Sequence, residues 1–155
     1  MRFLAIYKTV EKNTPPTTEE MASMGKFIEE VTASGVLLAT EGCLPSARGA
    51  RVRLAKGKLT VTDGPFTESK ELIAGFALLQ VKSKEEAVEW TKRFIQVAGD
   101  GEAEVRQIAE PSDFGAELTP ELREQEERWR AQAAENAQAA ENAQAAENAQ
   151  AAKNR

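Results

Sequence analysis

The sequence predicts an α+β protein of the ferredoxin-like βαββαβ class, with a hairpin insertion and a helical C-terminal tail. Three observations predict this class. Strand-like and helix-like segments follow the order strand, helix, strand, hairpin, strand, helix, strand, which matches a split β-α-β unit. Both helix-like segments begin with a hydroxyl residue and a glutamate three positions later, the capping-box spacing. Hydrophobic residues make up 41 % of the chain, enough for one compact core.

The first half of the fold follows from local patterns. Residues 3–10 form an apolar strand. Thr17 and Glu20 predict a helix start, and Gly35 lies where that helix ends. Residues 36–40 are predicted as the second strand. The buried stripe of the helix consists of apolar residues at helical spacing: Met21, Met24, Phe27, Ile28 and Val31.

The second half begins with the hairpin insertion. Residues 51–54 and 59–62 flank a short turn and predict two paired strands. A nearly continuous apolar run at 75–81 predicts the next strand of the sheet, and Ser83 and Glu86 open the second helix. The remaining features are the buried stripe of that helix and a last strand: Ala87, Val88, Thr91, Phe94, Ile95, Ala98 and residues 103–108.

The predicted sheet is apolar on both faces. Its first strand has two apolar sides, made of Phe3, Ala5 and Tyr7 and of Leu4, Ile6 and Val10. Two helices cover only one face of a sheet, and a face exposed to water usually alternates polar and apolar residues. Because an uncovered apolar face would be larger than monomers tolerate, the sequence predicts a homodimer that packs sheet against sheet.

Composition restricts the function classes. The net charge of −5 does not point to nucleic acid, whose binding proteins carry basic patches. No apolar run reaches the roughly 18 residues that span a bilayer, and the single cysteine, Cys43, fits a reducing compartment. We therefore expect a cytoplasmic protein without a membrane segment. Cys43 is expected to be a small buried residue.

The chain contains no histidine. This absence removes the commonest general base near neutral pH and the commonest metal ligand. It also removes the usual serine and cysteine triads. No metal-ligand spacing and no phosphate-binding glycine loop is found, so neither a metal nor another cofactor is predicted. Any catalysis must use carboxylates, lysine, arginine, tyrosine or the lone thiol.

The composition changes after about residue 110, which predicts a main domain at 1–110 and a tail at 111–155. Thr119 and Pro120 mark a helix start. An Ala-Glu-Asn-Ala-Gln-Ala pattern then recurs every six residues, which turns each copy by about 120° around a helix and forms no lasting stripe. The tail is predicted as a solvated helix. A docking arm that uses Leu118, Leu122 and Trp129, or an appended non-native segment, is the alternative.

Residues 1–109 resemble the YCII-related family, in its DGPF branch. The segments that carry the resemblance are residues 63–71 (Asp-Gly-Pro-Phe-Thr-Glu-Ser-Lys-Glu), 41–45 (Glu-Gly-Cys-Leu-Pro), 75–76 (Gly-Phe), 86–90 and 104–106. The resemblance implies a dimeric α+β barrel built from ferredoxin-like subunits. One branch of the family carries a His–Asp pair and is regarded as enzymatic, which does not transfer to a chain without histidine. Association of some members with sigma factors implies a regulatory role.

The signature segment supplies the first candidate site. Asp63, Glu68, Lys70 and Glu71 are predicted as a polar cluster, in which a carboxylate near a lysine has a pKa suited to proton transfer. The structural alternative is that Asp63 caps a turn and that its neighbours are solvated. Phe66 is expected to fill the core beneath the loop.

Tyr7 and Glu41 are predicted to face a cavity between subunits, where they act with Asp63 in catalysis. The alternative is ordinary packing for Tyr7 and a strand-end position for Glu41. The predicted ligand-binding residues are Glu68, Lys70, Arg53 and Phe66. A basic stretch around the hairpin attracts an anionic metabolite or an acidic partner, or is simply solvated: Arg48, Arg51, Arg53, Lys56 and Lys58.

Two functions follow from these residues. The first is a small dimeric protein that binds a ligand or a regulatory partner. The second is a cofactor-free lyase or isomerase acting on a small anionic metabolite, with Asp63 or Glu41 as base and Tyr7 or Lys70 as acid or electrostatic stabiliser. The sequence does not choose between a binding protein and an enzyme.

Overall fold

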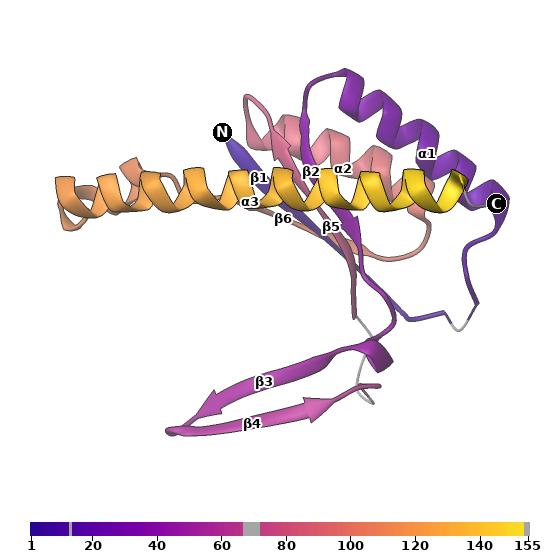
Figure 1. Ribbon diagram of the computed structural model, residues 1–155, viewed down its shortest axis with the longest axis horizontal. Coiled ribbons are helices and arrows are strands. Elements are labelled where there is room, and N and C mark those ends of the chain that lie inside the picture. Colours follow the sequence, from indigo (N-terminus) through magenta and orange to yellow (C-terminus); the bar gives the residue numbers. More distant parts are fainter. Residues whose placement is uncertain (13, 67–71, 154–155) are drawn as a thin grey trace. The chain divides into compact units, whose positions relative to one another are not determined.

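The computed structural model describes residues 1–12, 14–66 and 72–153, and the chain divides into two units, Met1–Ile108 and Ala109–Arg155. The first unit contains a four-stranded antiparallel sheet in the order β2-β5-β1-β6 (Figure 1). Its strands are β1 (Arg2–Thr9), β2 (Leu37–Gly42), β5 (Leu72–Gln80) and β6 (Glu102–Gln107). A helix follows β1 and another follows β5, so the predicted ferredoxin-like α+β class is confirmed.

Helices α1 (Thr18–Ala33) and α2 (Lys84–Ala98) pack on one face of this sheet (Figure 1). Both begin where the capping patterns predicted. Thr17 and Glu20 form a reciprocal capping box, and the Ser83 hydroxyl accepts a hydrogen bond from the Glu86 backbone N–H. The core between helices and sheet is built from Phe3, Val31, Val36, Leu79, Val81 and Ala87.

The opposite face of the sheet, which we call the open face, is covered by neither helix. Phe3 is 2 % exposed in the core, so its alternate neighbours Leu4 and Ile6 point to the open face. On β5, Leu78 lies opposite Leu4 and Phe76 lies opposite Ile6. We call these four residues, Leu4, Ile6, Phe76 and Leu78, the apolar floor.

The predicted hairpin is present as β3 (Ala50–Ala55) and β4 (Lys58–Asp63), which form a separate two-stranded sheet (Figure 1). Lys56 and Gly57 make the turn, with φ values of 49° and 76°. Positive φ at both central positions is the geometry that matches the twist of a two-residue hairpin. The hairpin enters the first unit between β2 and β5, after a short 3-10 turn, η1 (Ser46–Arg48).

The second unit consists of η2 (Pro111–Glu117) and a long helix, α3 (Pro120–Lys153). The six-residue repeat gives α3 a regular set of side-chain hydrogen bonds four positions apart. Gln132, Gln138 and Gln144 each donate their amide to the asparagine one turn later. These bonds offset part of the low helix propensity of asparagine. Within the described residues, no helix combines the length and apolar character needed to cross a membrane.

Candidate functional site

A transverse row of four side chains crosses the open face from β2 to β6. In register, this row contains Glu41, Phe76, Ile6 and Glu104. Neighbouring strands lie about 4.8 Å apart, so the backbones that carry the two carboxylates are separated by about 14 Å. At that distance Glu41 and Glu104 cannot share a proton. The two apolar side chains between them leave an apolar surface bounded by charge at both ends.

A second row lies beside the first and ends in a cation. It contains Ala39, Leu78, Leu4 and Arg106. The Arg106 side chain is 71 % exposed and gives one Nη1 hydrogen bond to Glu104, out of the five N–H donors that a guanidinium carries. A guanidinium at the margin of an apolar surface is the arrangement that recognises a carboxylate attached to an apolar body.

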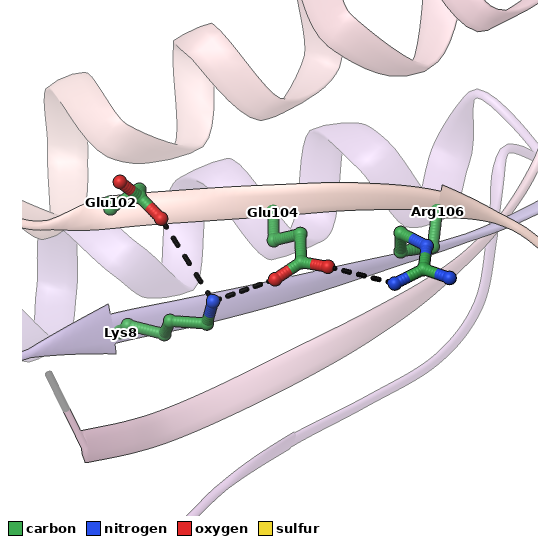
Figure 2. Close-up of polar contacts among 4 residues, drawn as sticks. All are labelled: Lys8, Glu102, Glu104 and Arg106. Atoms are coloured by element: carbon green, nitrogen blue, oxygen red, sulfur yellow. Dashed lines mark hydrogen bonds and ion pairs between the residues drawn. The ribbon is translucent and has the colours of Figure 1, made fainter.

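Ionic contacts join β1 and β6 along this margin, as Figure 2 shows. Lys8 Nζ donates to Glu104 Oε2 at 2.6 Å and lies 3.9 Å from Glu102 Oε1. Arg106 Nη1 donates to the other Glu104 oxygen at 3.1 Å. The hydrogen bond from Lys8 lowers the pKa of Glu104 most, and the hydrogen bond from Arg106 lowers it further. Glu104 therefore acts as an anionic clamp that positions two cations, and it is a poor base near neutral pH.

The lowered pKa of Glu104 predicts how stability depends on pH. A carboxylate whose folded pKa is depressed contributes stability above its ordinary value of 4.5 and loses that contribution as the pH falls through the folded pKa. The Glu104→Gln variant should therefore lose less stability than the parent between about pH 5 and pH 3. Urea unfolding at several pH values measures the difference. Glu102→Gln is the control, because its 3.9 Å contact is beyond hydrogen-bond distance; equal slopes for Glu104→Gln and the parent would contradict the clamp.

A second polar cluster ties the base of the hairpin to the end of β1. The Glu11 carboxylate accepts hydrogen bonds from the Ser46 backbone N–H and, at 2.8 Å, from Ser46 Oγ. Ser46 Oγ in turn accepts the Phe66 backbone N–H at 3.2 Å, and the Gly64 N–H donates to the Gly49 carbonyl at 2.9 Å. We call this cluster the Glu11–Ser46 junction. It fixes both ends of the hairpin insertion to one carboxylate.

The structure places Tyr7 and Glu41 on opposite faces of the sheet. The Tyr7 hydroxyl donates to the Asp100 carbonyl at 2.9 Å, and its ring packs edge-on against Phe94 of α2 at 5.2 Å. Tyr7 therefore holds the turn between α2 and β6, which is the packing alternative. Glu41 is exposed on the open face. One subunit does not bring these two predicted catalytic residues together.

Asp63 and Arg53 lie on the hairpin, and both are exposed. Asp63 pairs with Ala50 at the end of β4, and Arg53 pairs with Thr60. The two pairs are an odd number of positions apart along the hairpin, so the side chains of Asp63 and Arg53 point to opposite faces. Glu68, Lys70 and Glu71 lie outside the described residues. The predicted catalytic set is thus distributed over three separate surfaces of the first unit.

Two expectations are corrected. Phe66 is half-buried rather than part of the core, and its ring lies 4.0 Å beneath the guanidinium of Arg51. This cation–π contact uses the ring to support the hairpin base. Cys43 is exposed rather than buried, because it follows β2 at the edge of the sheet.

Sequence reasoning assigned no role to Glu11, Ser46, Lys8 or Glu104. One signal could have pointed to Lys8: the alternation of β1 places its side chain on the same face as Ile6.

Among the described residues, no group of three or more His, Cys, Asp or Glu side chains is placed to hold a metal ion. The open face carries apolar side chains, the Glu41 carboxylate at its β2 margin, and Lys8, Glu104 and Arg106 at its β6 margin.

A family model for the YCII-related domain matches residues 1–112. The chain belongs to the YCII-related family. This match does not separate the branches of the family, so the DGPF assignment stays a prediction. An uncharacterized protein of Rhizobium meliloti (strain 1021) is 32 % identical to this YCII-related protein over 85 residues, which are 54 % of this chain and 65 % of that protein. The chain thus spans less than two thirds of the length of that relative.

A solved structure with a similar chain course is 5-chloro-2-hydroxyhydroquinone dehydrochlorinase from Burkholderia phenoliruptrix AC1100, in complex with 2,5-dihydroxybenzoquinone. The similarity covers 70 % of this YCII-related chain and 94 % of that chain, with 14 % identity and a TM-score of 0.44. At this level of similarity, the ligand of that enzyme says nothing about the chemistry of the present chain.

Proposed function

We propose that this YCII-related protein binds a small, partly apolar organic anion on the open face of its sheet, and that it works as a cytoplasmic homodimer. The observation that carries the proposal is the row that ends in Arg106, where a guanidinium borders the apolar residues Leu4 and Leu78. These residues span two strand spacings, about 10 Å. That length suits a carboxylate on a single ring or on a short aliphatic chain.

Homodimer formation supports this site, because the open face of one subunit gives a ligand only a floor. A second copy packed over it removes water from the ligand and strengthens the contact of the ligand with Arg106. The apolar floor also favours a dimer without any ligand, because α1 and α2 both pack on the other face and an exposed apolar patch is unfavourable in water. The proposal includes a regulatory role of the sigma-factor-associated kind, and the family resemblance is what supports that role.

A thermal-shift screen tests the ligand site. Aromatic and aliphatic carboxylates are compared with their neutral amides, and a ligand at 100 times its dissociation constant stabilises the native state by about 2.7 kcal/mol. Stabilising carboxylates should bind about tenfold or more weakly to Arg106→Gln, because a charged hydrogen bond is lost. Arg93→Gln is the control, since Arg93 also pairs with one glutamate, Glu30, but lies on the helices. Equal binding by parent and Arg106→Gln would refute the site.

Catalysis by a cofactor-free lyase or isomerase is the second candidate. The observation in its favour is that Glu41 shares the open face with the floor and can act as a base on a ligand held there. Against it, the proposed acid Tyr7 is bonded to Asp100 on the other face. Incubating each stabilising carboxylate with the protein and analysing the products separates the two functions. An enzyme should convert the ligand and lose that activity in Glu41→Gln, whereas a binding protein returns the ligand unchanged.

A further inference from the structure

The β3–β4 hairpin carries a continuous row of apolar side chains that the described residues of the first unit leave exposed. Cross-strand pairing puts Val52 opposite Val61 and Leu54 opposite Leu59 on one face of the hairpin. Their exposed fractions are 70, 65, 67 and 67 %, in that order. We call these four residues the apolar ladder. The other face is polar and carries Arg51, Arg53, Lys58, Thr60 and Thr62.

An amphipathic two-stranded hairpin of this kind requires a partner. Isolated hairpins are marginally stable in water, and β3 and β4 pair only with each other among the described strands. Every residue of both strands is exposed. Local interactions at the base, through the Glu11–Ser46 junction, position the hairpin but bury none of the apolar ladder. The ladder therefore has no packing partner among the described residues of the first unit.

We propose that the apolar ladder of one chain packs on the apolar floor of a second copy, and forms the roof of the ligand site there. This inference rests on the proposed function, because it names the partner subunit as the supplier of the roof. The two surfaces have the same chemistry, and neither covers the other within one chain, since Phe76 in the floor is still 37 % exposed. A two-fold dimer allows both hairpins to dock reciprocally.

Interface size favours a reciprocal arrangement. A stable interface buries about 800 Å² on each partner, more than four aliphatic side chains can supply. In a two-fold dimer each subunit contributes both a ladder and a floor, so two ladder–floor contacts form per dimer. The polar face of the hairpin then stays in water with its cations, as the rim of an interface does.

Charge favours a second copy as the occupant. Residues 50–63 contain four basic side chains and one acidic one, which makes the hairpin +3, while the whole chain carries −5. The remainder of residues 1–108 holds 11 basic and 14 acidic side chains and is therefore −3, so the hairpin of one copy is attracted to the first unit of another. Such long-range attraction speeds association and weakens with salt.

Two matched double variants test the docking surface in the full chain. Val52→Asp with Leu54→Asp places two carboxylates on the apolar ladder, whereas Thr60→Asp with Thr62→Asp places two on the polar face of the same hairpin. We expect the first pair to raise the dimer dissociation constant by about 100-fold or more, because charges would be buried unpaired, and the second pair to change it several-fold at most. Light scattering and sedimentation measure assembly, and circular dichroism confirms that both variants fold.

Cross-linking locates the contact. In a Cys43→Ser background, a chain with Leu54→Cys is mixed with a chain of different mass that carries Leu78→Cys, and a bismaleimide of about 10 Å reach is added, the spacing of stacked sheets. The proposal predicts a product between the two different chains, and none when Thr60→Cys replaces Leu54→Cys. A product only between two Leu54→Cys chains, or only between two Leu78→Cys chains, would overturn the roof.

The outcomes separate the two proposals. If the parent forms dimers and the ladder variant forms them equally well, the hairpin inference is wrong, while the homodimer and the ligand site remain. If the parent is a monomer at low micromolar concentration, both the hairpin inference and the proposed homodimer are wrong. Loss of ligand binding in Arg106→Gln tests the floor of the site whatever the state of the hairpin.

Discussion

Replacing Gly64 by alanine is expected to lower the free energy of unfolding of the first unit by about 2–3 kcal/mol, because the new side chain has no space. A Cβ at this position would lie 1.8 Å from the Ser46 carbonyl oxygen and 2.5 Å from its carbon. Both are backbone atoms, so no side-chain rotation relieves the overlap. The structure must move the Glu11–Ser46 junction, which should also release the base of the hairpin.

Urea unfolding and thermal unfolding measure the loss of stability in Gly64→Ala, and limited trypsin digestion measures the release of the hairpin base. The melting temperature should fall by on the order of 10 °C, and cleavage at the basic residues of β3 and β4 should become faster. Gly25→Ala is the control. Gly25 lies within α1 with no atom within 4 Å of an added Cβ, so alanine should stabilise the helix by up to about 1 kcal/mol. A Gly64→Ala protein as stable as the parent would show that the junction yields easily.

Alanine substitutions of Phe3 and Phe76 should have opposite signatures, although the two residues lie on neighbouring strands of one sheet. Phe3 is 2 % exposed in the core between sheet and helices, so its loss should cost about 3–5 kcal/mol at any protein concentration. Phe76 is 37 % exposed on the open face, so its loss should cost the isolated subunit much less and should mainly weaken dimer formation.

Unfolding at two protein concentrations, together with sedimentation, distinguishes these signatures. Phe3→Ala should lower stability equally at both concentrations. Phe76→Ala should lower it chiefly at the higher one, where dimers are populated. If Phe76→Ala behaves like Phe3→Ala, the open face is part of the core of the subunit, and neither the dimer nor the ligand site can use it.

The effect expected for Gly64 also gives the signature segment a physical meaning. Its glycine is required because the Ser46 carbonyl occupies the place of a side chain. The Phe66 N–H closes the junction through Ser46 Oγ. Both contacts are structural, so Asp63 and Gly64 in this segment mark the end of the hairpin insertion. The open face, which carries the proposed ligand site, is formed by other residues.

Local patterns predicted the elements of this fold well. The hydroxyl-to-glutamate spacing at Thr17 and at Ser83 identified both helix starts, because capping acts over three residues. The apolar residues on both sides of β1 identified a sheet with a second face to cover. The Glu11–Ser46 contact could not be predicted, since it joins residues 35 positions apart and no periodic pattern connects them.

The face on which Glu41 lies does not follow from the residue alternation of β2. The register of β2 against β5 shifts between Leu37 and Ala39. Leu37 pairs with Leu79 of the core, so strict alternation would also have turned Glu41 toward the helices. The irregularity moves Glu41 to the open face. A bulge is decided by backbone pairing, and the side-chain pattern of one strand does not reveal it.

The glutamine-to-asparagine bonds of α3 make this helix tolerant of changes in length. Each six-residue copy supplies its own bond and adds about 9 Å to the helix. Because three copies complete five whole turns, gaining or losing three leaves the far end facing its former direction, whereas a single copy rotates it by a third of a circle. The tail can thus gain or lose whole copies while each remaining copy keeps its glutamine-to-asparagine bond.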